Sequence, residues 1–187
     1  MTTMSKRDRL VDAAKTMFFQ QGIARSTLAD IAQQAQVPLG NVYYHFRTKE
    51  ALVEAVIQAH IQELESQFAQ WEHQYSEPRQ RLLALLVMSR DEENMLARYG
   101  CPHGSLCQEL DKDENQLAAI AARLFQIYLD WTETQFHLLG KTEQEANDLA
   151  IDLISSLQGT YLLTNSFRSS ALLERKLQRL EAWIRQL

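Results

Sequence analysis

The chain has 187 residues, of which 45% are hydrophobic and 23% charged, and its formal net charge is −5. This length suits one domain, or a small domain plus a larger one, and the apolar content argues against intrinsic disorder. The chain has no 18-residue uncharged apolar run and no apolar signal core at its start, so we expect a cytoplasmic protein with no membrane partner and two reduced cysteines.

Charge is unevenly distributed along the chain. Residues 1–60 carry seven basic and five acidic side chains, whereas the rest carries 12 basic and 19 acidic ones. A mildly basic segment ahead of an acidic remainder suits a protein in which the N-terminal segment alone meets DNA phosphates.

The N-terminal third predicts three helices in quick succession. Apolar residues recur at three- and four-residue steps over about 6–20, and Gly22 ends that helix. Thr27, with an acidic residue three positions on, caps a short second helix. After a turn at 36–37, a third helix of two turns covers about 38–45, with proline as its first residue.

The remaining chain predicts six further helices separated by short connections. Residues 91–96 are too polar to place, and 99–104, with two Gly and one Pro, indicate a loop. The expected helices are 48–71, 79–90, a short helix capped by Ser105, one from Asp113 or Asn115 to Leu138, 143–167 capped by Thr142, and 170–185. We therefore predict an all-α fold of about nine helices, with one domain at 1–48 and a second at 49–187, of which 49–72 form a linking helix.

The two short helices joined by a tight turn after a longer one predict a helix-turn-helix. Ala32 is small where the two helices cross, and Val37 and Val42 fill the wedge between them. The third helix is then the recognition helix, which enters the major groove of DNA. On it Asn41 can pair with adenine and Leu39 can contact a thymine methyl group.

The stretch from Thr27 to Leu52 resembles the TetR family of bacterial transcriptional regulators. It has a turn valine, a glycine, an aliphatic–tyrosine pair, a His-Phe pair and a Lys-Glu-x-Leu segment, found here at Val37, Gly40, Val42-Tyr43, His45-Phe46 and Lys49-Glu50-Ala51-Leu52. The resemblance implies that Thr27, Tyr43 and Lys49 contact phosphate and that exposed recognition positions read bases. The candidate DNA-binding residues are Thr27, Leu39, Gly40, Asn41, Tyr43, Tyr44, His45 and Lys49.

Two departures from the family pattern concern the operator sequence. Family members often carry Ser-Lys where this chain has Pro38-Leu39, and a glycine or another small residue where it has Gln36. A basic contact to DNA is therefore missing from the start of the recognition helix.

The resemblance also implies a C-terminal ligand-binding and dimerisation domain. The last two long helices of such regulators form a four-helix bundle with a second copy, and the expected interface residues are Leu153, Leu157, Tyr161, Leu173, Leu177 and Leu180. An effector pocket is expected among the middle helices, with Phe125, Tyr128, Trp131 and Tyr161 as candidates. For both sets the alternative is that the residues are ordinary core of the chain itself.

The segment from Gly100 to Cys107 resembles a Gly-Cys-x-x-Gly-x-Leu segment in a subset of TetR regulators, including some that sense electrophiles or oxidants. If Ser105 caps a helix, Cys107 lies in its first turn and Cys101 just before it, where the helix end lowers a thiol pKa. A protonated His103 would add to this effect. Three interpretations stay open: inert buried cysteines, a thiol sensor, and a soft-metal site made of Cys101, His103 and Cys107 without an evident fourth ligand.

We expect a DNA-binding transcriptional regulator, specifically a repressor that a small-molecule or stress effector releases from its operator. It would act as a homodimer without metal or cofactor. An enzyme is not expected, because no catalytic triad, Gly-rich phosphate loop or paired carboxylate site is evident. The alternatives are a thiol- or metal-responsive regulator acting through Cys101 and Cys107, and a helical interaction protein without specific DNA binding.

Overall fold

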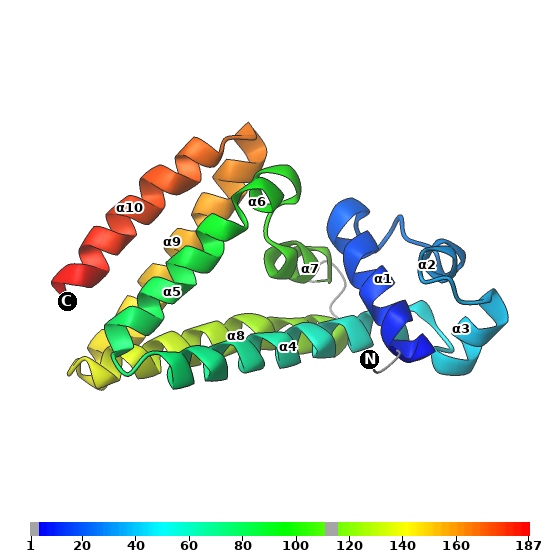
Figure 1. Cartoon of the computed structure of the whole chain (residues 1–187), viewed down its shortest axis with the longest axis horizontal. Helices are drawn as coiled ribbons and strands as arrows, with labels where there is room; N and C mark the ends of the chain where they lie inside the picture. Colours follow the sequence, from blue (N-terminus) through cyan, green and yellow to red (C-terminus); the bar gives the residue numbers. More distant parts are fainter. Residues whose placement is uncertain (1–3, 111–115) are drawn as a thin grey trace. The chain divides into compact units, whose positions relative to one another are not determined.

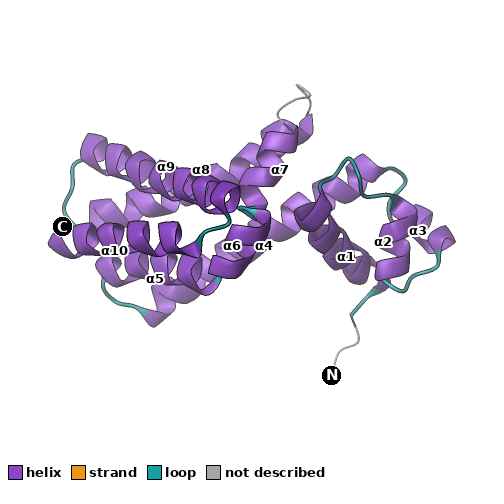
Figure 2. Ribbon diagram, turned by 90° about the horizontal axis from the view of Figure 1, so that it is seen from above, coloured by secondary structure: helices purple, strands orange, loops and turns teal. Residues whose placement is uncertain are grey.

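The computed structural model describes residues 4–110 and 116–187, and every regular element in these ranges is a helix (Figure 1, Figure 2). The helices are α1 Lys6–Gln21, α2 Leu28–Gln34, α3 Leu39–His45, α4 Lys49–Gln74, α5 Pro78–Asp91, α6 Glu93–Tyr99, α7 Pro102–Leu110, α8 Gln116–Leu138, α9 Glu143–Phe167 and α10 Ser170–Gln186. The all-α prediction with an N-terminal helix-turn-helix is confirmed. No helix within these ranges is long and apolar enough to cross a lipid bilayer.

The described residues contain one helix more than the sequence predicted. The additional helix is α6, in a segment whose polarity hid its periodicity, because Leu96 is its buried residue while most of its other side chains are polar. The sequence predicted about nine helices, and the described ranges contain ten.

Helix α7 begins four residues earlier than predicted, at Pro102 rather than directly after a cap at Ser105. The predicted loop at 99–104 and the cap at Ser105 are wrong in this respect, since Pro102, His103 and Gly104 are already helical. Proline suits the first turn of a helix, where its missing N–H would have no helical partner. The predicted start of α8 at Asp113 or Asn115 lies outside the described residues.

The chain forms two compact units rather than two consecutive domains. Unit 1 comprises Met1–Glu63 and Pro102–Leu124, and unit 2 comprises Leu64–Cys101 and Phe125–Leu187. The predicted boundary at residue 48 differs from this division, since the first half of α4 and all of α7 belong with the three N-terminal helices. The three N-terminal helices alone have little apolar surface for a core, and α4 adds Leu52, Val53, Val56 and Ile57, all buried.

Local capping in unit 1 follows the sequence closely. Gly22 ends α1 with φ of 85°, and its N–H donates to Phe18 O at 2.9 Å. The Thr27 hydroxyl accepts the Asp30 N–H at 3.1 Å at the start of α2. The Thr48 hydroxyl accepts the Ala51 N–H at 3.2 Å at the start of α4. These caps satisfy N–H groups that the helices leave without internal partners.

Unit 2 is built on α5, α6, α9 and α10, together with the second half of α4 and most of α8. Helix α10 packs on both α5 and α9, and α6 packs on α9 (Figure 1). An aromatic stack joins α4 to α8, where the rings of Phe68 and Trp131 lie 4.2 Å apart and 12° from parallel. The Trp131 indole also donates to Glu72 at 2.9 Å, so its polar atom is satisfied.

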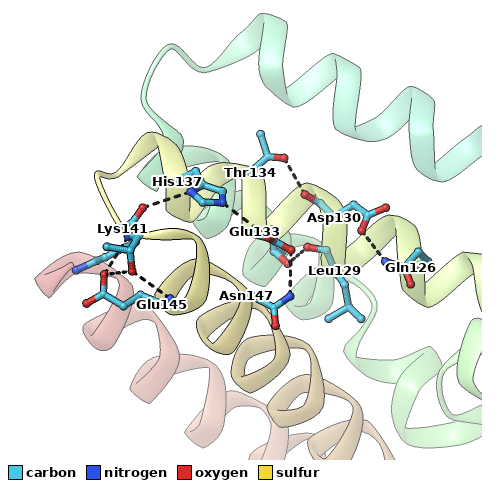
Figure 3. Close-up of polar contacts among 11 residues, drawn as sticks. Gln126, Leu129, Asp130, Glu133, Thr134, His137, Lys141, Glu145 and Asn147 are labelled. Carbon is cyan, nitrogen blue, oxygen red and sulfur yellow. Dashed lines mark hydrogen bonds and ion pairs between the residues drawn. The ribbon is translucent and has the colours of Figure 1, made fainter.

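The turn between α8 and α9 is held by side-chain hydrogen bonds (Figure 3). The predicted cap is confirmed as a capping box, in which Thr142 N–H donates to Glu145 Oε2 at 2.9 Å and Glu145 N–H donates to Thr142 Oγ1 at 3.4 Å. Asn147 of α9 donates to Glu133 of α8 at 3.2 Å. These bonds fix where α9 starts and link its N-terminal end to the C-terminal end of α8.

Candidate DNA-binding site

The turn between α2 and α3 is tight because of one residue in a left-handed conformation. Gln36 has φ of 53°, and Val37 N–H then donates back to Ala32 O at 3.0 Å. Ala32, Val37 and Val42 are all buried, as the helix-turn-helix prediction requires. The wedge between the two short helices is therefore filled by the three residues that the sequence indicated.

Helix α3 has a buried side and an exposed side. Val42 is fully buried, whereas Leu39, Tyr43 and Tyr44 are 44%, 53% and 85% exposed. Three large apolar or aromatic side chains exposed on one helix of seven residues are typical of a binding surface. The distribution along this helix matches that of a recognition helix.

The other predicted positions on α3 complete this surface. Asn41 and His45 are half-buried, and the rings of Tyr44 and His45 lie 5.1 Å apart, edge to face. No atom lies within 4 Å of the position that a Cβ at Gly40 would take, so packing inside the chain does not require glycine there. The absent side chain leaves the backbone of α3 open to an approaching partner.

Thr27 and Lys49 already have partners within the chain. The exposed Thr27 hydroxyl caps α2 and also donates to the Asp30 carboxylate at 2.6 Å. Lys49 Nζ donates to Ala24 O at 3.4 Å, and its side chain is half-buried. A phosphate contact by either residue would therefore add to an existing contact or replace it.

The structure adds Arg7, which sequence reasoning did not single out. Its guanidinium lies 5.4 Å from the centre of the Phe46 ring, directly after the end of α3. This cation–π contact places a positive charge beside the recognition helix. The cluster of basic residues at the start of the chain was the signal that could have indicated it.

The aromatic residues predicted to line an effector pocket lie mainly in the core of unit 2. Tyr128, Trp131 and Tyr161 are buried there, and Phe125 packs against them. The Tyr161 hydroxyl lies 2.5 Å from that of Ser89, and burial raises the pKa of Tyr161 above its ordinary value. Tyr128, Trp131 and Tyr161 are therefore core residues, as the alternative interpretation of the sequence proposed.

A groove of about 230 Å³ lies in unit 2 between one face of α4 and one face of α5. Trp71, Tyr75 and Met88 contribute its apolar surface, and Asp91 and Glu92 stand at one end. Burial and the charge of Asp91 raise the pKa of Glu92. This groove is lined by aromatic side chains and by carboxylates, whereas the residues predicted for the effector pocket are all aromatic.

The cysteine segment is arranged differently from the prediction. Cys107 is buried at the sixth position of α7 rather than in the first turn, and its thiol donates to Ala121 O at 3.4 Å. Burial, and secondarily the neighbouring His60, lowers the pKa of His103 to about 3, so His103 is neutral and supplies no positive charge. Cys101 packs against the core of unit 2, and the two cysteines form no disulfide.

No group of three or more histidine, cysteine or carboxylate side chains in the described part of the chain is arranged to hold a metal ion. Cys107 and His103 belong to unit 1, whereas Cys101 closes a segment of unit 2. The physical reasons offered for a reactive Cys107 therefore do not apply to this structure.

The residues predicted for the dimer interface need correction. All six are buried in the chain's own core: Leu153, Leu157, Tyr161, Leu173, Leu177 and Leu180. Their periodicity marks the inward faces of α9 and α10. The exposed apolar residues of these helices are Ile151, Leu162, Leu163, Phe167 and Leu172.

Comparisons with known proteins match this geometry. A family model described as "Bacterial regulatory proteins, tetR family" matches residues 10–56. The transcriptional repressor KstR2 of Mycolicibacterium smegmatis is 34% identical over 85 residues, which are 46% of this chain and 42% of that protein. The chain thus spans less than half the length of this relative.

Two further comparisons extend over nearly the whole chain. The repressor DhaR of Mycobacterium sp. is 26% identical over 177 residues, which are 92% of this chain and 83% of that protein. A TetR transcriptional regulator from Legionella pneumophila has a TM-score of 0.84 at 20% identity, covering 100% of this chain and 98% of that one. The likeness to the Legionella structure shows a shared fold.

Proposed function

We propose that the chain is a regulator of the TetR family, whose N-terminal model it matches, and that it represses transcription by binding a double-stranded operator through α3. The observation that carries the proposal is the exposed surface of α3, where Leu39, Tyr43 and Tyr44 face outward over a buried Val42. Membership of this family also agrees with the expectation of a regulator rather than an enzyme.

The roles proposed for the site residues follow their exposure. Leu39 and Asn41 reach base edges in the major groove, where a methyl contact and an amide pair distinguish A·T pairs. Tyr43, His45, Thr27 and Lys49 contact phosphate oxygens, which position the helix without reading sequence. The Arg7 guanidinium beside Phe46 adds a further phosphate contact.

The test is a gel shift with the DNA immediately upstream of the chain's own gene, at physiological salt and with random DNA as competitor. Wild type is compared with Tyr43→Ala and with a control, Met95→Ala, which is exposed on α6. We expect wild type and the control to resist competitor, and Tyr43→Ala to bind at least about tenfold more weakly. Equal binding to random DNA, or no effect of Tyr43→Ala, would support the helical interaction protein instead.

We also propose that the chain acts as a homodimer through the exposed apolar side of α9 and its neighbour α10. TetR-family regulators act as dimers, and a symmetric dimer can place two recognition helices in successive major grooves, about 34 Å apart. Exposed Leu162 and Phe167 on α9 and Leu172 on α10 offer apolar surface. No atom lies within 4 Å of a Cβ built at Gly159, so a second helix can approach closely there.

For the effector we propose the groove of unit 2 lined by Trp71, Tyr75 and Met88. It offers ring faces and a solvent opening, whereas the predicted aromatic residues are mostly packed in the core. Val87→Trp, at a groove position that is 47% exposed, fills the groove without disturbing the core. In a reporter strain we expect this variant to keep repressing when an added compound releases wild type, and release of both would argue against the groove.

A further inference from the structure

The loop between α1 and α2 is held by a residue that lies 85 positions further along the chain. After α1 ends, the N–H groups of Ile23 and Ala24 have no carbonyl of the helix to bond. Ile23 N–H donates to Glu109 Oε2 at 2.8 Å, and Ala24 N–H donates to Glu109 Oε1 at 2.9 Å. Each carboxylate oxygen of Glu109 thus accepts one backbone N–H of the loop.

The fit between the loop and this carboxylate is close. Gly22 has φ of 85°, and a Cβ built there would lie 3.2 Å from both Glu109 oxygens. The two N–H groups donate to different oxygens of Glu109. A carboxylate has two accepting oxygens, whereas a carboxamide has one accepting oxygen and an NH₂ group that donates. Hydrogen bonds to an ionised acceptor are also stronger than neutral ones.

The same loop is held from its other side and leads directly into α2. Lys49 Nζ donates to Ala24 O at 3.4 Å, so Ala24 is bonded through both its N–H and its carbonyl. The buried Ser26 hydroxyl donates to Gly22 O at 2.8 Å. Thr27, which caps α2, follows immediately. The position of the loop therefore sets where the helix-turn-helix begins.

Helix α7, which carries Glu109, is anchored in unit 1. Its buried residues Leu106, Cys107 and Leu110 form one face, and α7 packs on α1. The ring of His103 meets that of His60 on α4, edge to face, with centres 4.9 Å apart. The chain enters α7 from unit 2 through the peptide bond between Cys101 and Pro102.

We infer that Glu109 is a positioning residue for operator binding, which holds the start of the helix-turn-helix from α7. This inference rests on the proposed function. Loss of this carboxylate frees the N–H groups of Ile23 and Ala24, and operator affinity then falls without any change in the residues of α3.

Three variants test the inference. Glu109→Gln keeps the length of the side chain but loses the charge and one acceptor, and Glu109→Asp keeps the charge but is too short to reach both N–H groups. Gln108→Ala, at an exposed neighbouring position on α7, is the matched control. We expect both Glu109 variants to bind the operator about tenfold more weakly and the control to bind as wild type.

Amide hydrogen exchange gives a readout that a general loss of stability would not produce. In Glu109→Gln the amides of Ile23 and Ala24 should exchange faster. The Gly22 amide, which donates to Phe18 O, should keep its wild-type rate. Leu106→Ala weakens the packing of α7 without removing the carboxylate. It is compared with Glu109→Gln under conditions in which the two variants have similar melting temperatures.

Unchanged operator affinity in both Glu109 variants, or unchanged exchange at Ile23 and Ala24, would overturn the inference. So would equal losses of affinity in Leu106→Ala and Glu109→Gln at equal melting temperature. Failure of wild type to bind the operator specifically counts against the proposed function. If wild type binds the operator specifically and Glu109→Gln binds it equally well, only the role inferred for Glu109 is contradicted.

Discussion

At the scale of single residues, the turn of the helix-turn-helix contains a conformation that its residue does not favour. Gln36 has φ of 53°, where the Cβ of an L-residue meets steric resistance that glycine avoids. The sequence had indicated Gln36 as a departure from the family's glycine or small residue. The structure supplies the physical meaning of that departure, because the turn requires the left-handed region whichever residue occupies it.

We predict that Gln36→Gly stabilises the chain by about 0.5–1 kcal/mol, since it removes this steric cost. The matched control is Gln33→Gly, at an exposed position inside α2, which should destabilise by about 1 kcal/mol. Urea unfolding measures both. A loss of stability in Gln36→Gly similar to that of the control would contradict the role assigned to this turn.

A second residue-scale feature is the contact between His60 and His103. Burial, and secondarily the charge of Lys15 on α1, lowers the pKa of His60 to about 4, and burial lowers that of His103 to about 3. Glu63 on α4 also faces this pair and forms an ion pair with Lys15. Both histidines are therefore neutral at pH 7, and protonation opposes the folded state.

This pair predicts a loss of stability in mild acid. In the unfolded chain each histidine has a pKa of about 6.5, so unfolding takes up protons below that pH. The stabilisation is fully present above about pH 6.5 and falls as the pH drops toward 4, by at most about 1.4 kcal/mol per pH unit for each histidine. Chemical denaturation across this range measures the slope.

The double variant His60→Gln with His103→Gln should flatten that slope, whatever its effect on stability at pH 7. His73→Gln, at an exposed position near the end of α4, should leave the slope as in wild type. A wild-type stability that does not change between pH 7 and 5 would show that the two rings are not buried as neutral groups.

At the scale of elements, the caps decide where helices begin, and the one on α9 is complete. Hydrogen bonds from the Thr142 backbone N–H and from its hydroxyl hold the pKa of Glu145 low. The same box fixes the start of the helix that follows the turn shown in Figure 3. Because α9 contributes Leu153, Ile154 and Leu157 to the core, its start also sets their register.

Thr142→Ala is expected to destabilise the chain by about 1 kcal/mol through loss of this cap. Gln144→Ala, at an exposed position in the same turn of α9, should change stability by less than about 0.5 kcal/mol. Thermal and urea denaturation compare the two. Equal values for both variants would mean that packing alone determines the start of α9.

At the scale of the whole molecule, the proposed dimer depends on the outward side of α9. Glutamate at both Leu162 and Phe167, which are 57% and 68% exposed, places charges in the proposed interface and leaves the core unchanged. We expect this double variant to sediment as a monomer and to lose most of its operator affinity, since one recognition helix then binds alone. Leu138→Glu, 58% exposed at the end of α8, serves as the control and should remain dimeric.

Features that depend on residues close together in the sequence were predicted correctly more often than features that depend on residues far apart. Thr27 and Thr142 each cap a helix through an N–H group three residues away, and both caps were predicted. The exposed side of α3 also followed from residues within one turn of each other. By contrast, six apolar residues of α9 and α10 were predicted to contact a second copy of the chain, but they pack in the core of their own chain. Periodicity identifies a buried helix face, and it does not say which chain covers that face.

The sequence by itself determined most of the helices, the caps at Thr27 and Thr142, the helix-turn-helix and the resemblance to the TetR family, because each depends on residues that are close along the chain. The tertiary structure alone decided that α7 belongs with the N-terminal helices, that Glu109 bonds Ile23 and Ala24, and that His60 meets His103. These contacts join residues tens of positions apart. Their geometry is set by packing of apolar faces throughout a unit, which no local pattern in the sequence specifies.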